Sequence, residues 1–282
     1  MKRVFILVIS TGVFVASWLR SLIVRLAGRE LPGSCVVLYY HAVPVQHKPR
    51  FERQMDDLMR IAEPISAARR SPLESGKRYV VITFDDAYRN ILANALPGLV
   101  ARRIPVTVFV VPEMLGRTPH LSDSSTSSSD ERKVMSVEDL QSLPSESVTI
   151  GSHSLTHPDL TTLSPKEALY ELAESKRVLE DVVQRPVQLF CFPYGAFSEE
   201  LFRLCQEVGY ERVFTTIPQS AFSDPGEFVT GRVRVDPTDW QIEFRLKLFG
   251  AYCWLPLAWT IKRKIYGQPI EARTPERVAP TK

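Results

Sequence analysis

Short apolar runs alternate with amphipathic stretches from residue 34 onward. The runs lie at 35–43, 79–84, 105–111, 147–152, 186–192, 212–217 and 228–236. Most are apolar at consecutive positions, which is typical of strands buried on both faces, as in a parallel sheet covered by helices. The alternation therefore predicts an α/β fold, either a barrel or a doubly wound sheet.

The stretches between these runs have helical periodicity. They lie at 51–62, 90–103, 164–183 and 198–209. The third is the clearest helix, because Ser164 can cap its N-terminus, Pro165 suits its first position and Glu167 completes a capping box. We expect these helices to cover the sheet.

The N-terminal segment has a different pattern. Residues 4–19 carry no charge. This run is slightly shorter than the ~20 apolar residues of a spanning helix and longer than the ~7–15 of a signal-peptide core. We interpret it as a membrane anchor, with a cleaved signal or an amphipathic or buried helix as alternatives. Basic residues flank it on both sides, so the positive-inside rule gives no orientation.

Composition narrows the function only a little. The chain has 282 residues and a net charge of +3, without the clustered basic stripe that nucleic-acid binding requires. Its cysteines are far apart and form no CxxC pair, so we expect buried free thiols and neither a disulfide framework nor a zinc cluster. They are Cys35, Cys191, Cys205 and Cys253.

We expect three parts along the chain. Residues 1–33 form the hydrophobic segment and a linker, 34–245 the α/β domain, and 246–282 an aromatic and basic segment with a polar tail. Within the last part, 247–267 is interpreted as a terminal helix packed on the domain. The alternative is a helix that lies on a membrane surface.

Polar side chains that could act in catalysis or bind a metal follow two of the strands. Asp85 and Asp86 end the run YVVITFDD, where adjacent negative charges repel; on its own the pair could be a turn or a helix N-cap. His153 and His157 follow another strand in GSHSLTHP, and one turn of helix or a tight loop would put both rings on one side. Two histidines and a carboxylate make a metal site with open positions, although two surface histidines are the plain alternative.

A third strand runs into the turn FCFPYG at 190–195. Gly195 allows the backbone to approach a ligand closely, and an exposed amide there could bind an oxyanion. The plain alternative is a turn that ends the strand. In parallel α/β folds the carboxyl ends of the strands carry the functional site, so all three motifs are expected at one edge.

In this order, TFDD, HSLTH after Gly-Ser, and FPYG resemble the motifs of the polysaccharide deacetylases, which are carbohydrate esterase family 4 or NodB-homology enzymes. The resemblance extends from about residue 35 to about residue 245. It implies a distorted, incomplete (β/α) barrel that removes N- or O-acetyl groups from amino sugars with a divalent metal ion.

The resemblance also implies roles for individual residues. Asp85 would be the general base, and a backbone amide around Tyr194 would help to hold the oxyanion. The metal ligands would be Asp86, His153 and His157. The metal would be zinc, with cobalt, nickel or iron as alternatives, because a His₂Asp set suits all four.

One further stretch is similar to a particular branch of the family. VVLYYHAV at 36–43 resembles a strand of the poly-N-acetylglucosamine deacetylases, in which the motif order is permuted and the general acid comes from this early strand. No histidine follows His157, so His41 is the candidate acid. The alternative is a buried histidine with a structural hydrogen bond.

The chain departs from the family at one position. Many members carry an arginine three residues before the proline of the third motif, where this chain has Phe190. Arg232 resembles an arginine on a late strand of similar proteins and is the candidate partner of Asp85. The alternative is a charge on the surface of a strand.

We therefore expect a metal-dependent hydrolase that removes N-acetyl groups from N-acetylglucosamine-type sugars of a polysaccharide or oligosaccharide. It would be associated with the bacterial inner membrane, facing the periplasm or the cell exterior. Two alternatives are a non-catalytic glycan-binding protein on the same fold and a membrane-tethered assembly factor. A phosphoesterase is disfavoured, because no Gly-rich phosphate loop accompanies the motifs.

Overall fold

The computed structural model describes residues 2–118 and 133–258. The strands are β1 Ser34–Tyr40, β2 Glu63–Pro64, β3 Arg78–Phe84, β4 Val106–Val110, β5 Val148–Ser152, β6 Leu189–Cys191, β7 Arg212–Phe214, β8 Val229–Thr230 and β9 Val233–Arg234. The helices are α1 Lys2–Leu26, α2 Lys48–Ile61, α3 Asn90–Asn94, α4 Leu96–Ala101, α5 Val137–Gln141, α6 Pro165–Val183, α7 Glu199–Glu207 and α8 Gln241–Leu248.

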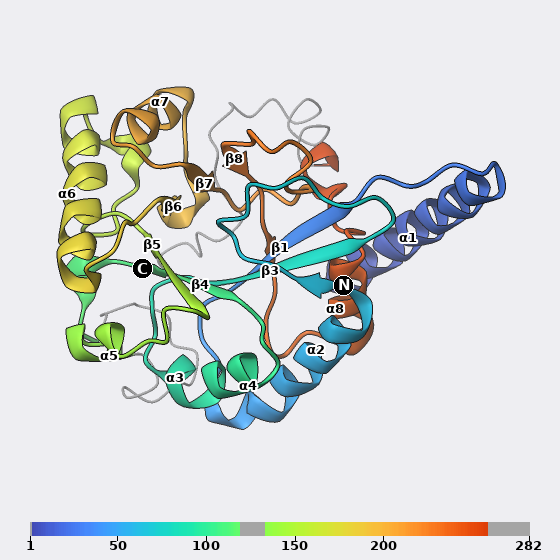
Figure 1. Ribbon diagram of the computed structural model, residues 1–282, viewed down its shortest axis with the longest axis horizontal. Coiled ribbons are helices and arrows are strands. Elements are labelled where there is room, and N and C mark those ends of the chain that lie inside the picture. The colour runs from blue at the N-terminus through green and yellow to red at the C-terminus, as the bar shows by residue number, and fades with distance from the viewer. Residues whose placement is uncertain (1, 119–132, 259–282) are drawn as a thin grey trace.

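The strands form one parallel sheet in the order β8-β7-β6-β5-β4-β3-β1-β9, and β2 pairs with β3. β8 and β9 lie at opposite ends of this order, yet only Gly231 and Arg232 separate them in the chain. A sheet whose two edges are joined by two residues must curl round on itself. The predicted incomplete (β/α) barrel is therefore confirmed, with helices such as α2, α4 and α6 around its outside (Figure 1).

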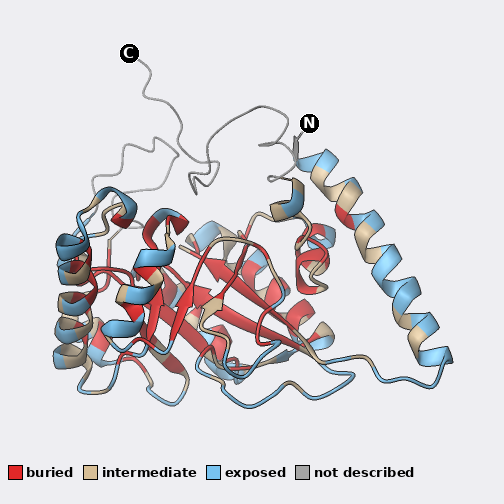
Figure 2. Ribbon diagram, turned by 90° about the horizontal axis from the view of Figure 1, so that it is seen from above, coloured by how far each residue is buried: buried red, intermediate tan, exposed pale blue. Residues whose placement is uncertain are grey.

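Both faces of the sheet are buried, as the continuous apolar runs predict. Val80 and Ile82 of β3 belong to the large core beneath the helices, whereas Tyr79 and Val81 belong to a smaller core inside the barrel. Figure 2 shows strands that are buried along most of their length, while the helices are exposed on their outer sides. The alternation of side chains along β3 directs Asp85 toward the barrel interior.

The predicted helix over 90–103 is wrong in one respect, because the structure has two short helices. α3 ends and α4 begins on either side of Ala95, whose φ and ψ are −121° and −53°. Pro97 has no N–H with which to continue the helix. The carbonyl of Ala93, four residues earlier, instead accepts a hydrogen bond from Lys48 Nζ at 2.8 Å.

The predicted single strand over 228–236 is also divided. β8 pairs with β7 and β9 pairs with β1, so the chain crosses from one edge of the sheet to the other between them. Gly231 lies at the crossing, and a Cβ there would collide with the carbonyl oxygen of Ile217. This crossing brings Arg232 to the carboxyl end of the strands, beside Asp85.

The outer parts of the chain agree with the sequence patterns where they are described. The capping box of Ser164 and Glu167 on α6 is confirmed, and the four cysteines are free, three of them buried. Residues 259–282, which include most of the expected C-terminal segment and its polar tail, lie outside the described residues.

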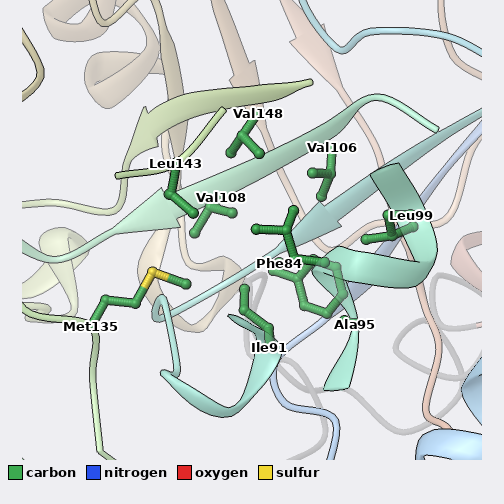
Figure 3. A pocket seen from close by; sticks show the side chains of 10 residues that line it. Phe84, Ile91, Ala95, Leu99, Val106, Val108, Met135, Leu143 and Val148 are labelled. Atoms are coloured by element: carbon green, nitrogen blue, oxygen red, sulfur yellow. The ribbon is translucent and has the colours of Figure 1, made fainter. Parts of the chain in front are cut away.

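A small apolar cavity lies between the sheet and the short helices α3 and α4. Figure 3 shows the side chains around it, among them Phe84, Ile91 and Met135. Its volume of about 10 Å³ is at the lower limit for one water molecule, and its walls offer that water no polar partner. It is a packing defect of the core and not a ligand site.

Candidate active site

The first element of the site is a buried ion pair between Asp85 and Arg232. Arg232 Nη1 donates to Asp85 Oδ1 at 2.7 Å and Nη2 donates to Oδ2 at 2.8 Å. The same guanidinium donates to Thr83 Oγ1 at 3.1 Å and to the Thr215 carbonyl at 3.3 Å. Arg232 is completely buried. Both oxygens of Asp85 are thereby held in one orientation.

This pairing controls the charge of Asp85. Burial alone would raise the pKa of its carboxyl, but the charge and hydrogen bonds of Arg232 outweigh burial and lower the pKa to about 2. The rings of Tyr39 and Phe109 cover the guanidinium, with centroids 4.5 and 5.4 Å from its central carbon. Asp85 is therefore an ionised and oriented carboxylate at neutral pH.

The second element is a set of three side chains that face one another. Asp86 Oδ1 lies 3.7 Å from His153 Nε2 and 3.6 Å from His157 Nε2. Asp86 has a φ of 65°, so the backbone turns directly after Asp85 and sends the two neighbouring carboxylates in different directions. The sequence motifs are thus brought together from the ends of β3 and β5.

These three residues fit a divalent metal ion. Ligands bound tetrahedrally at about 2.1 Å lie about 3.4 Å from one another, close to the separations found here. His153 Nδ1 lies 2.7 Å from the carbonyl oxygen of Cys191; a carbonyl can only accept, so Nδ1 carries the proton and Nε2 keeps its lone pair for a metal. Burial lowers the pKa of His157 to about 4, and His153 adds to this effect against the opposing charge of Asp86.

A second group of potential ligands lies deeper, but it does not fit a cation. It consists of Asp85, His153 and Cys191. Arg232 Nη2 lies 2.8 Å from both Asp85 Oδ2 and Cys191 Sγ, so a positive charge already stands there. Burial also raises the pKa of the Cys191 thiol well above its ordinary value, which keeps the sulfur protonated.

The loop that carries the two histidines is held by a residue that the sequence reading missed. Glu171 on α6 accepts hydrogen bonds from the backbone amides of Leu155 and Thr156 at 2.9 and 3.0 Å, and from Thr156 Oγ1 at 2.7 Å. The capping box of Ser164 and Glu167 fixes the start of α6, the helix that carries Glu171. Glu171 is one of four glutamates on this amphipathic helix, and nothing in the sequence distinguishes it from the others.

The third motif lies beside the histidines. Tyr194 has a φ of 57°, is 56% exposed, and its ring packs edge-on against His157 with centroids 4.7 Å apart. Gly195 also has a positive φ, and a Cβ there would collide with Thr216. The turn is therefore tightly constrained next to the candidate metal ligands.

His41 follows β1 and lines an open hollow of about 260 Å³. The hollow is partly polar and is also lined by Tyr88, Arg234 and Asp236. The His41 ring packs edge-on against Tyr39, with centroids 5.8 Å apart, and Tyr39 in turn covers Arg232. His41 thus belongs to the same edge of the barrel, at the side of the site opposite the Tyr194 turn.

Phe190, where the family motif has an arginine, is buried against Phe192 and Tyr210 in the core beneath the helices. Its side chain faces away from the barrel interior, where Leu189 and Cys191 point. In this chain the guanidinium beside Asp85 comes from the β8–β9 crossing.

Comparisons with known proteins bear on the family and the fold. A family model described as polysaccharide deacetylase matches residues 73–213, which is half of the chain. The chain is 26% identical to YxkH of Bacillus subtilis, a predicted polysaccharide deacetylase, over 219 residues, 74% of each chain. It is 24% identical to a chitooligosaccharide deacetylase of Bradyrhizobium sp. over 166 residues, 58% of this chain and 68% of that protein.

Among solved structures, IcaB from Ammonifex degensii has a similar fold. The TM-score is 0.64 at 21% sequence identity, over 79% of this chain and 98% of IcaB.

Proposed function

This chain belongs to the polysaccharide deacetylase family, and on that premise we propose that it removes N-acetyl groups from N-acetylglucosamine-type sugars of a polysaccharide or oligosaccharide. Asp85 is the general base and His41 the general acid. Asp86, His153 and His157 would hold a divalent metal ion.

The observation that carries this proposal is the contrast between two adjacent carboxylates. Asp85 is buried and held by two hydrogen bonds from Arg232, whereas Asp86 faces two imidazole nitrogens. Amide hydrolysis by this route needs one group that takes a proton from water and another that binds the metal ion, which polarises the substrate carbonyl. The two environments supply one of each.

The proposed steps follow from the residues of the chain. When bound, the metal ion polarises the acetyl carbonyl and lowers the pKa of the attacking water. Asp85 accepts the proton of that water, and Arg232 acts as a positioning residue that keeps the carboxylate ionised and oriented. A backbone amide at the Tyr194 turn donates to the developing oxyanion.

The departing amine needs a proton, since an amide nitrogen is otherwise a poor leaving group. In the proposal His41 donates it from the end of β1. What supports this role is the position of His41 on the wall of an open hollow at the same edge of the barrel. Positioned acids and bases each contribute about 10²–10⁴-fold to such reactions.

We further propose that zinc is the metal, with cobalt, nickel or iron as the other candidates for a His₂Asp set. The protein would act at the bacterial inner membrane, facing the periplasm or the cell exterior. What supports a membrane location is α1: Arg3–Leu26 is long and apolar enough to cross a membrane, and little of it is buried against the described part of the chain.

The experiment is acetate release by the full-length protein from a panel of acetylated glycans, with the metal content measured in the same samples. We expect release from at least one N-acetylglucosamine polymer, its loss on chelation, and its recovery when metal is restored. A protein that keeps its metal and binds a glycan but releases no acetate would be a glycan-binding protein, and the proposal would be wrong.

A further inference from the structure

Helix α1 has two chemically different faces. Its 3.6-residue period places Arg3, Ser10, Ser17, Ser21 and Arg25 on one side, together with Leu7 and Phe14, which pack against the core. The opposite side carries no charge among its exposed positions, and the large apolar residues there are Val4, Phe5, Val8, Val15, Leu19, Leu22, Ile23 and Leu26. Gly12 and Ala16 lie between them, and Thr11 lies at the edge of this side. A helix that crosses a bilayer is surrounded by lipid and gains nothing from such a division. A helix that lies at an interface requires it.

The polar side of α1 is fastened to the domain at its N-terminal end. Arg3 Nε donates to Glu243 Oε2 at 2.8 Å, and Arg3 Nη2 donates to the Thr238 carbonyl at 3.3 Å. The Arg3 guanidinium also stacks on the Trp240 ring, 4.5 Å from its centroid. Glu243 and Asp239 share the buried Lys247, so Arg3 completes a network of two anions and two cations.

Two further contacts continue along the same side. Trp254 Nε1 donates to Ser10 Oγ at 3.0 Å, and Ser10 is completely buried. The rings of Phe14 and Phe249 lie 4.7 Å apart between centroids. The docked part of α1 thus extends over about the first half of the helix.

Both ends of α1 are therefore tied to the same domain. Arg3 contacts Glu243 at one end, and at the other end residues 27–33 lead back to β1 at Ser34. A helix of 25 residues is about 37 Å long, enough to cross a hydrocarbon core of about 30 Å. If it crossed, Arg3 and Ser34 would lie on opposite sides of the membrane, and the contacts of Arg3 with the domain could not exist.

We propose that α1 lies in the plane of a bilayer surface, with its apolar stripe in the lipid and its polar side on the domain, so that the chain is attached to one leaflet without crossing it. The apolar stripe is defined by the eight exposed residues named above. Arg20, Arg25 and Arg29 near the end of the helix suit the anionic headgroups of bacterial lipids. This inference deepens the proposed membrane association and is independent of the proposed chemistry.

The attachment also brings the site toward the membrane. Thr238, which Arg3 contacts, follows directly after Asp236 and Pro237 on the wall of the His41 hollow. The N-terminal end of α1 therefore adjoins the rim of the candidate site. A glycan chain that is anchored in, or emerges from, the same leaflet is the substrate that this placement favours.

The test is the topology of the full-length chain in bacterial membranes, with one epitope tag before Met1 and another after Lys282. Spheroplasts and inverted vesicles are treated with protease. We expect both tags to be cleaved in the same preparation and protected in the other. Cleavage in opposite preparations would mean that α1 spans the membrane, and loss of the first tag without protease would mean a cleaved signal; either result overturns the inference.

A pair of matched variants separates a helix at the surface from a spanning one. Val15→Glu puts a charge in the apolar stripe, and Ser17→Glu puts the same charge on the polar side at almost the same depth along the helix. We expect Val15→Glu to reduce the membrane-bound fraction about tenfold, and Ser17→Glu to leave it unchanged. Equal losses in both variants contradict the inference, since a spanning helix would suffer from either charge.

The remaining outcomes concern other occupants of the stripe. If the wild-type chain is a dimer without lipid and Val15→Glu makes it a monomer while membrane binding persists, the stripe is an interface between two copies and the inference is wrong. If the wild-type chain does not bind membranes at all, the proposed location fails with it. Acetate release from soluble oligosaccharides, measured on the same samples, shows separately whether the proposed chemistry stands.

Discussion

Two completely buried arginines lie at opposite ends of the barrel, and their surroundings differ. Arg232, at the carboxyl end of the strands, is paired with Asp85 through two hydrogen bonds. Arg212, at the start of β7, donates within the described residues only to backbone carbonyls, those of Ala67, Arg69 and Glu227. Its guanidinium stacks on the Phe222 ring, 4.1 Å from the centroid. Its Nη2 is without a hydrogen-bond partner within the described residues.

The electrostatics follow from this difference. Burial and the neighbouring Arg70 lower the pKa of Arg212 to about 10, because no carboxylate is bonded to it. At the other end, Arg232 and Asp85 stabilise each other's charges and outweigh the same burial. Arg212 joins neighbouring loops at the amino end of the strands, whereas Arg232 sets the charge and direction of a candidate base. The role of a buried arginine can therefore be inferred only from the group with which it is paired.

The largest expected effect comes from removing the guanidinium at the carboxyl end. Arg232→Met leaves the buried Asp85 carboxylate without a counter-ion, and we expect the free energy of unfolding to fall by about 3–5 kcal/mol. Acetate release should fall as well, because Asp85 loses its orientation. Denaturant unfolding monitored by circular dichroism measures the first effect.

Arg212→Met is the matched control at the amino end. It removes hydrogen bonds to carbonyls but strands no charge, so the expected loss is about 1–3 kcal/mol, with acetate release per folded molecule unchanged. Equal losses of stability in the two variants would show that the ion pair at the carboxyl end contributes no more to the free energy of unfolding than the hydrogen bonds of Arg212 do.

The second prediction concerns acid. The pKa of Asp85 lies near 2 in the folded chain, below its ordinary value of 3.8, so the unfolded chain binds the proton more readily. The stabilisation from this group is therefore complete above about pH 4 and is lost as the pH falls toward 2, a change of about 2 kcal/mol. Unfolding of the metal-free protein between pH 5 and 2 measures it.

Asp85→Asn is the control for this pH dependence, because an amide does not titrate. The pKa of His157 is also lowered, from 6.5 to about 4. The folded protein therefore loses stability at this group in a separate window, as the pH falls from about 6.5 to about 4. If the unfolding curve of Asp85→Asn kept the same slope between pH 4 and 2, the Arg232 pairing would not be the source of the effect.

The smallest expected effect is on metal affinity. Glu171→Gln exchanges one carboxylate oxygen for an amide nitrogen that cannot accept the hydrogen bonds of the 155–156 loop. The loop beside His157 should loosen, and zinc affinity should fall about tenfold. Glu174→Gln, a change at a partly exposed position of the same helix that affects only the Arg177 pair, should leave affinity unchanged in the same competition titration.

The choice of a barrel over a doubly wound sheet comes from the family resemblance alone, but the pattern along the sequence predicts the parallel sheet well, because runs such as 79–84 are apolar at every position except Thr83, as is typical of strands buried on both faces. It fails at two places where a single residue outweighs the pattern. Pro97 ends one helix early, and the crossing at Gly231 divides one apolar run between two edges of the sheet. Such a division depends on which strands lie opposite each other, which periodicity alone does not reveal.

Some residues of the candidate site could be predicted from the sequence and others could not. Asp86, His153 and His157 lie in short motifs, and the structure brings their side chains together. The sequence suggests Arg232 only through a resemblance, since it lies 147 residues from Asp85. Glu171 has no local signal at all, because its importance arises from the way α6 packs against the histidine loop.

The central claim is that Asp85 and Asp86 have different tasks although they are neighbours. The most direct test compares Asp85→Asn with Asp86→Asn, measuring bound metal and acetate release in the same preparations. We predict that Asp85→Asn keeps its metal and loses acetate release about 10²–10⁴-fold, whereas Asp86→Asn loses both. Loss of metal in both variants, or near wild-type acetate release by Asp85→Asn, would contradict the claim.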